Sequence, residues 1–169
     1  MNTPYDDAPI IATLALDPRS FARLDSWRQA HFPDRGYSLP AHLTLFHKLP
    51  PHAGPRVARA LGPGRGAVPL IFQGLRPLAR GTAVDAESPA LHALRARIAK
   101  AFAGELTKQD SRPAWRPHVT VQNKVDPAEA ERDRMAIATD FAPWSGYGPA
   151  VLLWRYLGGP WEFEASIPL

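Results

Sequence analysis

The chain of 169 residues is 45% hydrophobic, which suffices for one sizeable core or for two small lobes that share one. It contains no cysteine, which excludes disulfides, a thiol nucleophile and thiolate metal sites. The formal net charge of +4 permits nucleic-acid binding without requiring it. Asp6 and Asp7 argue against a signal peptide, and no apolar run approaches the ~20 residues of a membrane span. We therefore expect a soluble, cytoplasmic, monomeric protein without a membrane partner.

Four helices are predicted by a capping residue directly before a proline, a combination typical of helix starts. These prolines are Pro18, Pro55, Pro89 and Pro127. Seven strand-like runs lie between and after the helices. They cover residues 10–16, 42–46, 68–75, 82–86, 118–123, 151–157 and 161–167. The order β-α-β-α-β, then β-α-β-α-β-β, predicts a single α+β domain over residues 1–169, built from two similar halves that meet near residues 69–80.

The most informative feature of the sequence is a short pattern that occurs twice. The first copy is His42-Leu43-Thr44-Leu45 and the second is His118-Val119-Thr120-Val121. Because residues i and i+2 of a strand point to the same face, each copy presents an imidazole beside a hydroxyl and turns its aliphatic residues into the core. Two facing imidazoles can act as general base and general acid, and the hydroxyls can hold a phosphoryl oxygen. One such histidine is more often structural, but the doubling favours catalysis.

The residues around both copies are neutral or basic. Neither residues 35–84 nor residues 111–125 include Asp or Glu. This setting suits an anionic ligand such as a phosphate ester. It disfavours a metal, because hard cations need carboxylates and thiolates are absent, so we expect no metal ligand and no cofactor. His47 is not expected in the site, since it follows His42 by five residues and would face the other side of a regular strand.

Five further residues are candidates for binding the substrate. Tyr37 and Trp115 precede the motifs and could stack on an unpaired base, with core or rim packing as the competing interpretation. Phe46 would face the cleft if the alternation that starts at His42 continues. Arg116 and Lys124 stand close to the second motif in the sequence and could approach a phosphate, with simple solvation as the alternative.

Paired H-x-T-x motifs in a chain of this length resemble the 2H phosphoesterase superfamily, whose closest branch looks like the bacterial 2′-5′ RNA ligases and RNA 2′,3′-cyclic phosphodiesterases. The resemblance rests on residues 41–46 and 116–121. It implies a bilobal fold with a pseudo-twofold axis, in which two antiparallel-sheet lobes with outer helices surround a central cleft lined by both motifs. It also implies metal-independent cleavage of 2′,3′-cyclic phosphate or 2′-5′ phosphodiester bonds in RNA or nucleotides.

The resemblance further implies a role for each motif residue. It favours His118 as the base that activates water and His42 as the acid that protonates the leaving ribose oxygen, with Thr44 and Thr120 bonded to non-bridging oxygens. Many members of the RNA branch carry an arginine where this chain has Asn123, which reduces the basic contacts expected to a longer RNA. The alternatives are a non-catalytic RNA- or nucleotide-binding module of the same fold, and a structural domain whose histidines satisfy core hydrogen bonds.

Overall fold

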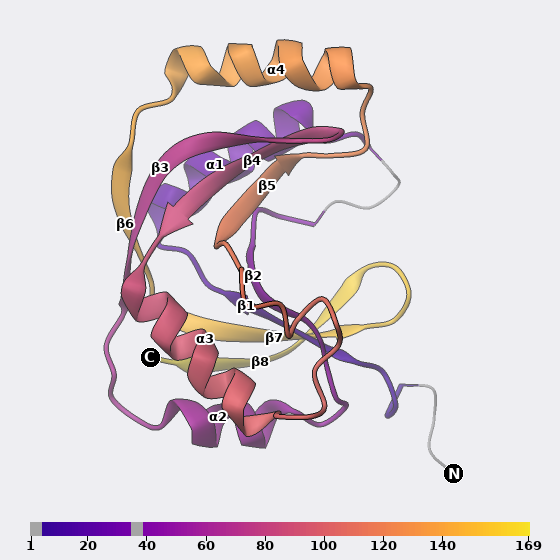
Figure 1. Ribbon diagram of the computed structural model, residues 1–169, viewed down its shortest axis with the longest axis vertical. Coiled ribbons are helices and arrows are strands. Elements are labelled where there is room, and N and C mark those ends of the chain that lie inside the picture. Colours follow the sequence, from indigo (N-terminus) through magenta and orange to yellow (C-terminus); the bar gives the residue numbers. More distant parts are fainter. Residues whose placement is uncertain (1–4, 35–38) are drawn as a thin grey trace.

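The computed structural model describes residues 5–34 and 39–169. Each predicted helix is present and contains its proline in the first turn (Figure 1). The helices are α1 (Pro18–His31), α2 (Gly54–Leu61), α3 (Pro89–Ala101) and α4 (Pro127–Asp140). Asp17 and Ser88 cap α1 and α3, because their side chains accept hydrogen bonds from the backbone N–H groups of Ser20 and Leu91.

Eight strands form one sheet in the described residues, and every pairing between neighbours is antiparallel. They are β1 (Ile10–Leu14), β2 (Leu43–Leu49), β3 (Val68–Leu78), β4 (Gly81–Glu87), β5 (His118–Gln122), β6 (Trp144–Gly148), β7 (Ala150–Tyr156) and β8 (Trp161–Pro168). Their order in the sheet is β6-β3-β4-β5-β2-β1-β7-β8. The sequence predicted seven of these strands and missed β6, whose glycines and proline-flanked ends lack the usual alternation.

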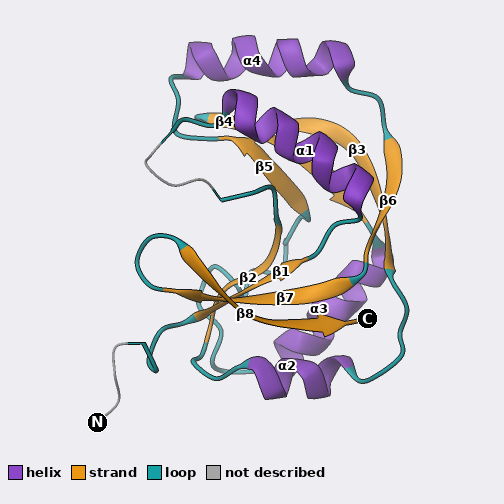
Figure 2. Ribbon diagram, turned by 180° about the vertical axis from the view of Figure 1, so that it is seen from behind, coloured by secondary structure: helices purple, strands orange, loops and turns teal. Residues whose placement is uncertain are grey.

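The sheet curls into two four-stranded halves, with helices on the outside of each (Figures 1 and 2). Helices α1 and α4 cover the half made of β6, β3, β4 and β5, and α2 and α3 cover the half made of β2, β1, β7 and β8. The halves meet where β2 pairs with β5. This architecture confirms the predicted α+β class and the bilobal antiparallel arrangement.

Residues 69–80 do not lie where the two halves of the sheet meet. They form most of β3 and the turn into β4, inside one half of the sheet. The chain crosses between the halves several times. Helix α1 follows β1 but packs against β5, and β3 follows α2 but pairs with β4 and β6. One half therefore consists of the four central strands, β3 to β6, and the other half combines the first two strands with the last two. The seam between them is the β2–β5 pairing.

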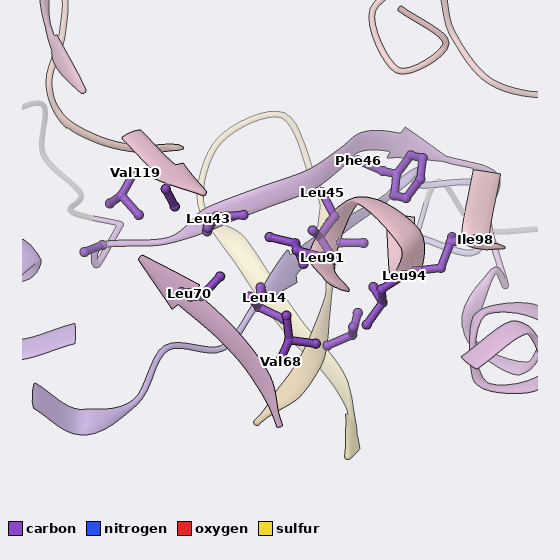
Figure 3. Packing of buried hydrophobic residues seen from close by; sticks show 14 of the residues in the cluster. Leu14, Leu43, Leu45, Phe46, Val68, Leu70, Leu91, Leu94, Ile98 and Val119 are labelled. Carbon is purple, nitrogen blue, oxygen red and sulfur yellow. The ribbon is translucent and has the colours of Figure 1, made fainter. Parts of the chain in front are cut away.

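The core lies between the sheet and the outer helices. Figure 3 shows aliphatic residues of β1, β2, β3, β5 and α3 in one cluster. Leu43, Leu45, Val119 and Val121, the aliphatic residues of the two motifs, are fully buried as predicted. Burial of each such side chain contributes about 1.5–3 kcal/mol relative to exposure. The same packing therefore stabilises the fold and fixes the direction in which the intervening motif residues point.

The close approach of β4 to the end of β5 yields a stability prediction. A Cβ added at Gly81 would collide with the backbone carbonyl of Gln122, whereas one added at Gly74 meets nothing within 4 Å. We expect Gly81→Ala to lower the free energy of unfolding by at least about 1–3 kcal/mol, because backbone must shift to admit the methyl group. Gly74→Ala is the matched control and should be neutral or slightly stabilising. Urea unfolding followed by tryptophan fluorescence tests this, and equal stability of the two variants would contradict it.

Candidate active site

Both motifs stand at the seam of the sheet, one on each side. Leu43 of β2 and Val119 of β5 are paired directly, and both are buried. In an antiparallel register centred on this pair, His42 lies across from Thr120, and Thr44 lies across from His118. All four of these side chains are half-buried, on the face opposite to the core. The doubled sequence pattern is thus a single local constellation with approximate twofold symmetry.

The two imidazoles are held by equivalent hydrogen bonds. Nδ1 of His42 lies 2.7 Å from the carbonyl oxygen of Pro40, and Nδ1 of His118 lies 2.8 Å from the carbonyl oxygen of Arg116. A carbonyl oxygen only accepts, so each Nδ1 carries the proton and donates it. Each neutral ring therefore keeps Nε2 as an unprotonated nitrogen, available to take a proton from a ligand or return it.

Each motif strand contains a β-bulge three residues after its histidine. In the β1–β2 ladder the register shifts between Thr44 and Phe46, and in the β4–β5 ladder it shifts between Thr120 and Gln122. Leu45 and Val121 are the extra residues. A bulge reverses the alternation of faces beyond it. The two bulges end the histidine–threonine face of both strands at the same point.

The bulge overturns the prediction that Phe46 faces the cleft. Its side chain is fully buried, beside the equally buried Leu45, and its ring packs 4.6 Å from the guanidinium of Arg95. The prediction assumed regular alternation from His42, which fails at Leu45. The same shift turns His47, which regular alternation placed on the far side, into an exposed position.

The other four candidates for substrate binding are placed differently from one another. Trp115 is half-buried against the core and contacts Arg95 and the ring of His92, so the rim-packing interpretation describes it well. Arg116 is 63% exposed and forms an ion pair with Asp85 at 2.7 Å. Lys124 is exposed and follows the end of β5 that is remote from His118. Tyr37 lies outside the described residues.

An arginine from an outer helix supports each motif strand. Arg28 of α1 is buried and donates from Nη1 to the carbonyl oxygen of Thr120 and from Nε to that of Leu39, both at 2.6 Å. Arg95 of α3 donates from Nε to the carbonyl oxygen of Leu45, the bulge residue, at 2.9 Å. Burial lowers the pKa of Arg28 to about 10, which leaves it charged at neutral pH. Both guanidinium groups thus satisfy carbonyl groups at or beside the bulges.

Burial dominates the electrostatics of both motif histidines. It lowers the pKa of His42 to about 4, in spite of the opposing hydrogen bond to Pro40. It also lowers the pKa of His118, although Asp85, its partner across the β4–β5 ladder, acts in the opposite direction. The nearby guanidinium groups add to the lowering, from Arg28 at His42 and from Arg76 at His118, and His47 has a smaller effect of the same sign at both rings. In the free protein both motif imidazoles are therefore neutral near pH 7.

The two walls of the site differ in chemistry. Beside His42 lies a cavity of about 200 Å³ with a mostly apolar lining. Its lining includes Thr13, Leu16, Phe21, His42, Trp154 and Trp161. The ring of Trp161 lies 4.6 Å from that of His42. On the opposite wall, next to His118, Asp85 forms ion pairs with both Arg76 and Arg116. One wall therefore offers aromatic surface and the other offers charge.

The comparison with protein families agrees with this geometry. The model of the 2'-5' RNA ligase superfamily matches residues 16–160. The chain belongs to this superfamily, which is a group of 2H phosphoesterases. No match was found among curated proteins. Membership supports a phosphoesterase activity in general terms.

Solved structures share the fold of this superfamily member. TT0787 of Thermus thermophilus is 17% identical over 95% of this chain and 97% of its own, with a TM-score of 0.64. LigT of E. coli complexed with NADP+ is also 17% identical, over 96% of this chain and 98% of its own, with a TM-score of 0.60. At these identities the likeness establishes the fold and not the substrate.

Several residues of the site could not be found from the phosphoesterase motifs. Trp161 and Trp154 reach His42 from β8 and β7, more than 100 positions later in the sequence. Arg28 reaches the second motif from α1. The spacing alone placed His47 on the far side of β2, and only the bulge turns it to the face of His42.

Among the described residues, no group of three His, Asp or Glu side chains could hold a metal ion. No helix in this part of the chain is long and apolar enough to cross a membrane.

The lowered pKa values predict an acidic pH optimum. A base must be neutral, so kcat/KM falls as the pH drops through the lower pKa, which is about 4 for His42. An acid must be protonated, so kcat/KM also falls as the pH rises through the higher pKa, which lies below the ordinary histidine value of about 6.5. We therefore expect a bell-shaped profile with its maximum between these limits.

NMR titration of the ring protons tests the same prediction without a substrate. In the free protein His42 should titrate near its lowered pKa, and inorganic phosphate should raise the midpoints of both motif histidines, because an anion favours the charged rings. A His42 midpoint at the ordinary value in the absence of phosphate would contradict the argument from burial.

Proposed function

We propose that this phosphoesterase hydrolyses 2′,3′-cyclic phosphate or 2′-5′ phosphodiester bonds of RNA or nucleotides, without a metal, by acid–base catalysis with His42 and His118. The observation that carries the proposal is the matched pair of imidazoles across the β2–β5 seam, each with Nδ1 committed to a backbone carbonyl and each beside a threonine hydroxyl. Such a pair can withdraw a proton from one side of a phosphate and supply one to the other.

The unequal surroundings of the two rings support a division of roles. His42, with its pKa lowered to about 4, stays neutral over the widest pH range and suits the base that activates water. Burial also lowers the pKa of His118, and Arg76 adds to this, but the hydrogen bond to Arg116 and the charge of Asp85 oppose it, so His118 suits the acid that protonates the leaving ribose oxygen. This assignment is the reverse of the one that the family resemblance favoured. Thr44 and Thr120 would stabilise the charge that develops on the non-bridging oxygens.

The aromatic wall supports a nucleotide as the substrate. Trp161 and Trp154 offer flat apolar surface beside His42 on which a base could lie. LigT of E. coli, which shares the fold, has been crystallised with NADP+, with 3'-AMP and with phosphate.

We further propose that Arg116 contributes positive charge toward the substrate and that Trp115 and Lys124 contribute at most at the rim of the site. We also propose that the protein acts as a monomer in the cytoplasm.

The main alternative is a nucleotide- or RNA-binding module that has the same fold but no activity. The presence of both histidines and both threonines in matched geometry argues against it, because binding alone does not need two free Nε2 atoms.

In the deciding experiment, the protein is incubated in EDTA with the four nucleoside 2′,3′-cyclic phosphates and with an RNA that ends in a cyclic phosphate. We expect turnover, with products identified by mass and by 2′- and 3′-phosphate standards. Turnover that stops in EDTA and returns with a divalent ion would contradict the proposal.

Substitutions of the motif residues test the mechanism. His42→Ala and His118→Ala should each lower kcat by about 10²–10⁴-fold. Because the two rings act as a unit, the double variant should be little worse than the weaker single variant. Thr44→Ala and Thr120→Ala each remove one hydrogen bond to a charged oxygen and should cost about 1.5–3 kcal/mol of transition-state stabilisation.

The pH profiles of the same variants test the division of roles. If His42 is the base, His42→Ala should lose the fall of kcat/KM at low pH, and His118→Ala should lose the fall at high pH. His31→Gln, which changes a histidine paired with Asp133 on the outer helices, is the control and should retain full activity. Full activity of either motif alanine variant would refute the paired mechanism.

A further inference from the structure

His47 lies on the same face of β2 as His42 and Thr44, with hydrogen bonds unlike those of the two motif histidines. The bulge at Leu45 reverses the alternation, so His47 and not Phe46 continues the face of His42 and Thr44. The His47 side chain is 46% exposed, whereas Phe46 is fully buried. Its ring is among the smaller causes that lower the pKa of both His42 and His118, so it is within electrostatic reach of both rings.

A buried carboxylate holds this third ring. Asp110, whose side chain is 1% exposed, accepts hydrogen bonds from Nδ1 of His47 at 3.1 Å and from the backbone N–H of His47 at 2.9 Å. Its second oxygen accepts from the backbone N–H of Lys48 at 2.8 Å. Burial raises the pKa of Asp110, but these hydrogen bonds outweigh it and hold that pKa below its ordinary value. Asp110 is therefore a carboxylate, and the proton of His47 sits on Nδ1.

Asp110 binds His47 through Nδ1 only, so the other ring nitrogen, Nε2, is left for a ligand. The motif histidines donate from Nδ1 to neutral carbonyl groups, but His47 donates from Nδ1 to an anion, in a charge-assisted hydrogen bond that fixes the ring. Arg95 fixes the support, since it donates to the carbonyl oxygens of Asp110 and of Leu45. An imidazole held rigidly in this way can, when protonated, donate from Nε2 to an anion.

The position of His47 separates it from the scissile phosphate. It follows Thr44 on the same face, beyond the bulge residue Leu45, so its ring lies next to the histidine–threonine constellation and not within it. This stretch lies away from the apolar cavity, which adjoins His42 at the other end of the motif. Lys48 is exposed there, and the positively charged Arg116 stands just before the second motif.

We propose that His47 binds a second phosphate group of the substrate, the 5′-phosphate of the nucleotide whose 2′,3′-cyclic phosphate lies between the motif histidines. This inference rests on the proposed function and narrows its substrate class. Nucleotides that carry a phosphate on the 5′ side, including the ends of RNA chains, are then preferred over cyclic mononucleotides without one.

The test compares two substrates that differ only in this group, adenosine 2′,3′-cyclic phosphate with and without a 5′-phosphate. Wild-type protein should show a kcat/KM about tenfold higher for the 5′-phosphorylated nucleotide, as expected for one hydrogen bond to a charged group. His47→Gln should remove this preference, so that the ratio of the two kcat/KM values falls to about one, whatever the effect of the substitution on the unphosphorylated nucleotide. His31→Gln, which alters the other histidine that is paired with an aspartate, should keep the preference.

Three outcomes would overturn the inference. They are equal kcat/KM of wild type for both nucleotides, an equal loss on both in His47→Gln, and an unchanged preference in that variant. If His47→Gln does not fold, His47→Asn provides the same comparison. The wild-type preference must also shrink as NaCl rises to 0.15 M and above, because attraction between partly exposed charges is screened over about 8 Å. A preference that is independent of salt would contradict a charged contact.

A binding measurement separates this inference from the proposed function. If wild type turned over neither nucleotide, the proposed function would fail. Calorimetric titration with adenosine 3′,5′-bisphosphate and with 3′-AMP would then decide the role of His47 without catalysis. Tighter binding of the bisphosphate by wild type, lost in His47→Gln, supports the inference, and equal binding of the two ligands refutes it.

Discussion

The pairing of β2 with β5 is the constraint on which the rest of this structure depends. It rests on one directly paired couple, Leu43 and Val119, both fully buried. Burial of these two residues turns the residues on either side toward the opposite face. The same contact therefore closes the seam between two four-stranded half-sheets and assembles the site. A register slip of one residue would send both histidines into the core and break the fold and the site together.

The connections between the halves make this seam hard to separate. Helix α1 follows a strand of one half and packs on the other, and its Arg28 donates to carbonyl groups on both sides of the seam. Arg95 performs a related task from α3, where it satisfies the carbonyl of the bulge residue Leu45. Buried backbone carbonyl groups that lack a partner are costly, so each bulge needs such a donor. The outer helices thus stabilise the irregular part of the motif strands as well as the core.

The sequence predicted the elements that follow local rules. Proline marked the start of all four helices, although only Asp17 and Ser88 cap their helices with a side chain and Gly54 lies inside α2. The i, i+2 spacing of the motifs correctly predicted the burial of Leu43 and Val119. It could not predict what depends on tertiary pairing. The positions of Phe46 and His47 depend on the bulge at Leu45, and this bulge is a property of the pairing between β1 and β2 that the sequence of β2 alone does not reveal. Trp161 comes from a strand near the C-terminus, and no local pattern links it to His42.

The symmetry of the motifs ends at the two rings, and this has consequences for how such a site works. Each histidine donates from Nδ1 to a backbone carbonyl oxygen, and burial lowers the pKa of both rings. Two neutral imidazoles provide no acid near pH 7, so one ring must take up a proton when the anionic substrate binds and favours a charged ring. Which ring takes it up depends on the walls. Asp85 lies across the ladder from His118, whereas the aromatic ring of Trp161 lies against His42 and offers no charge. A duplicated motif thereby acquires two distinct roles from surroundings that are not duplicated.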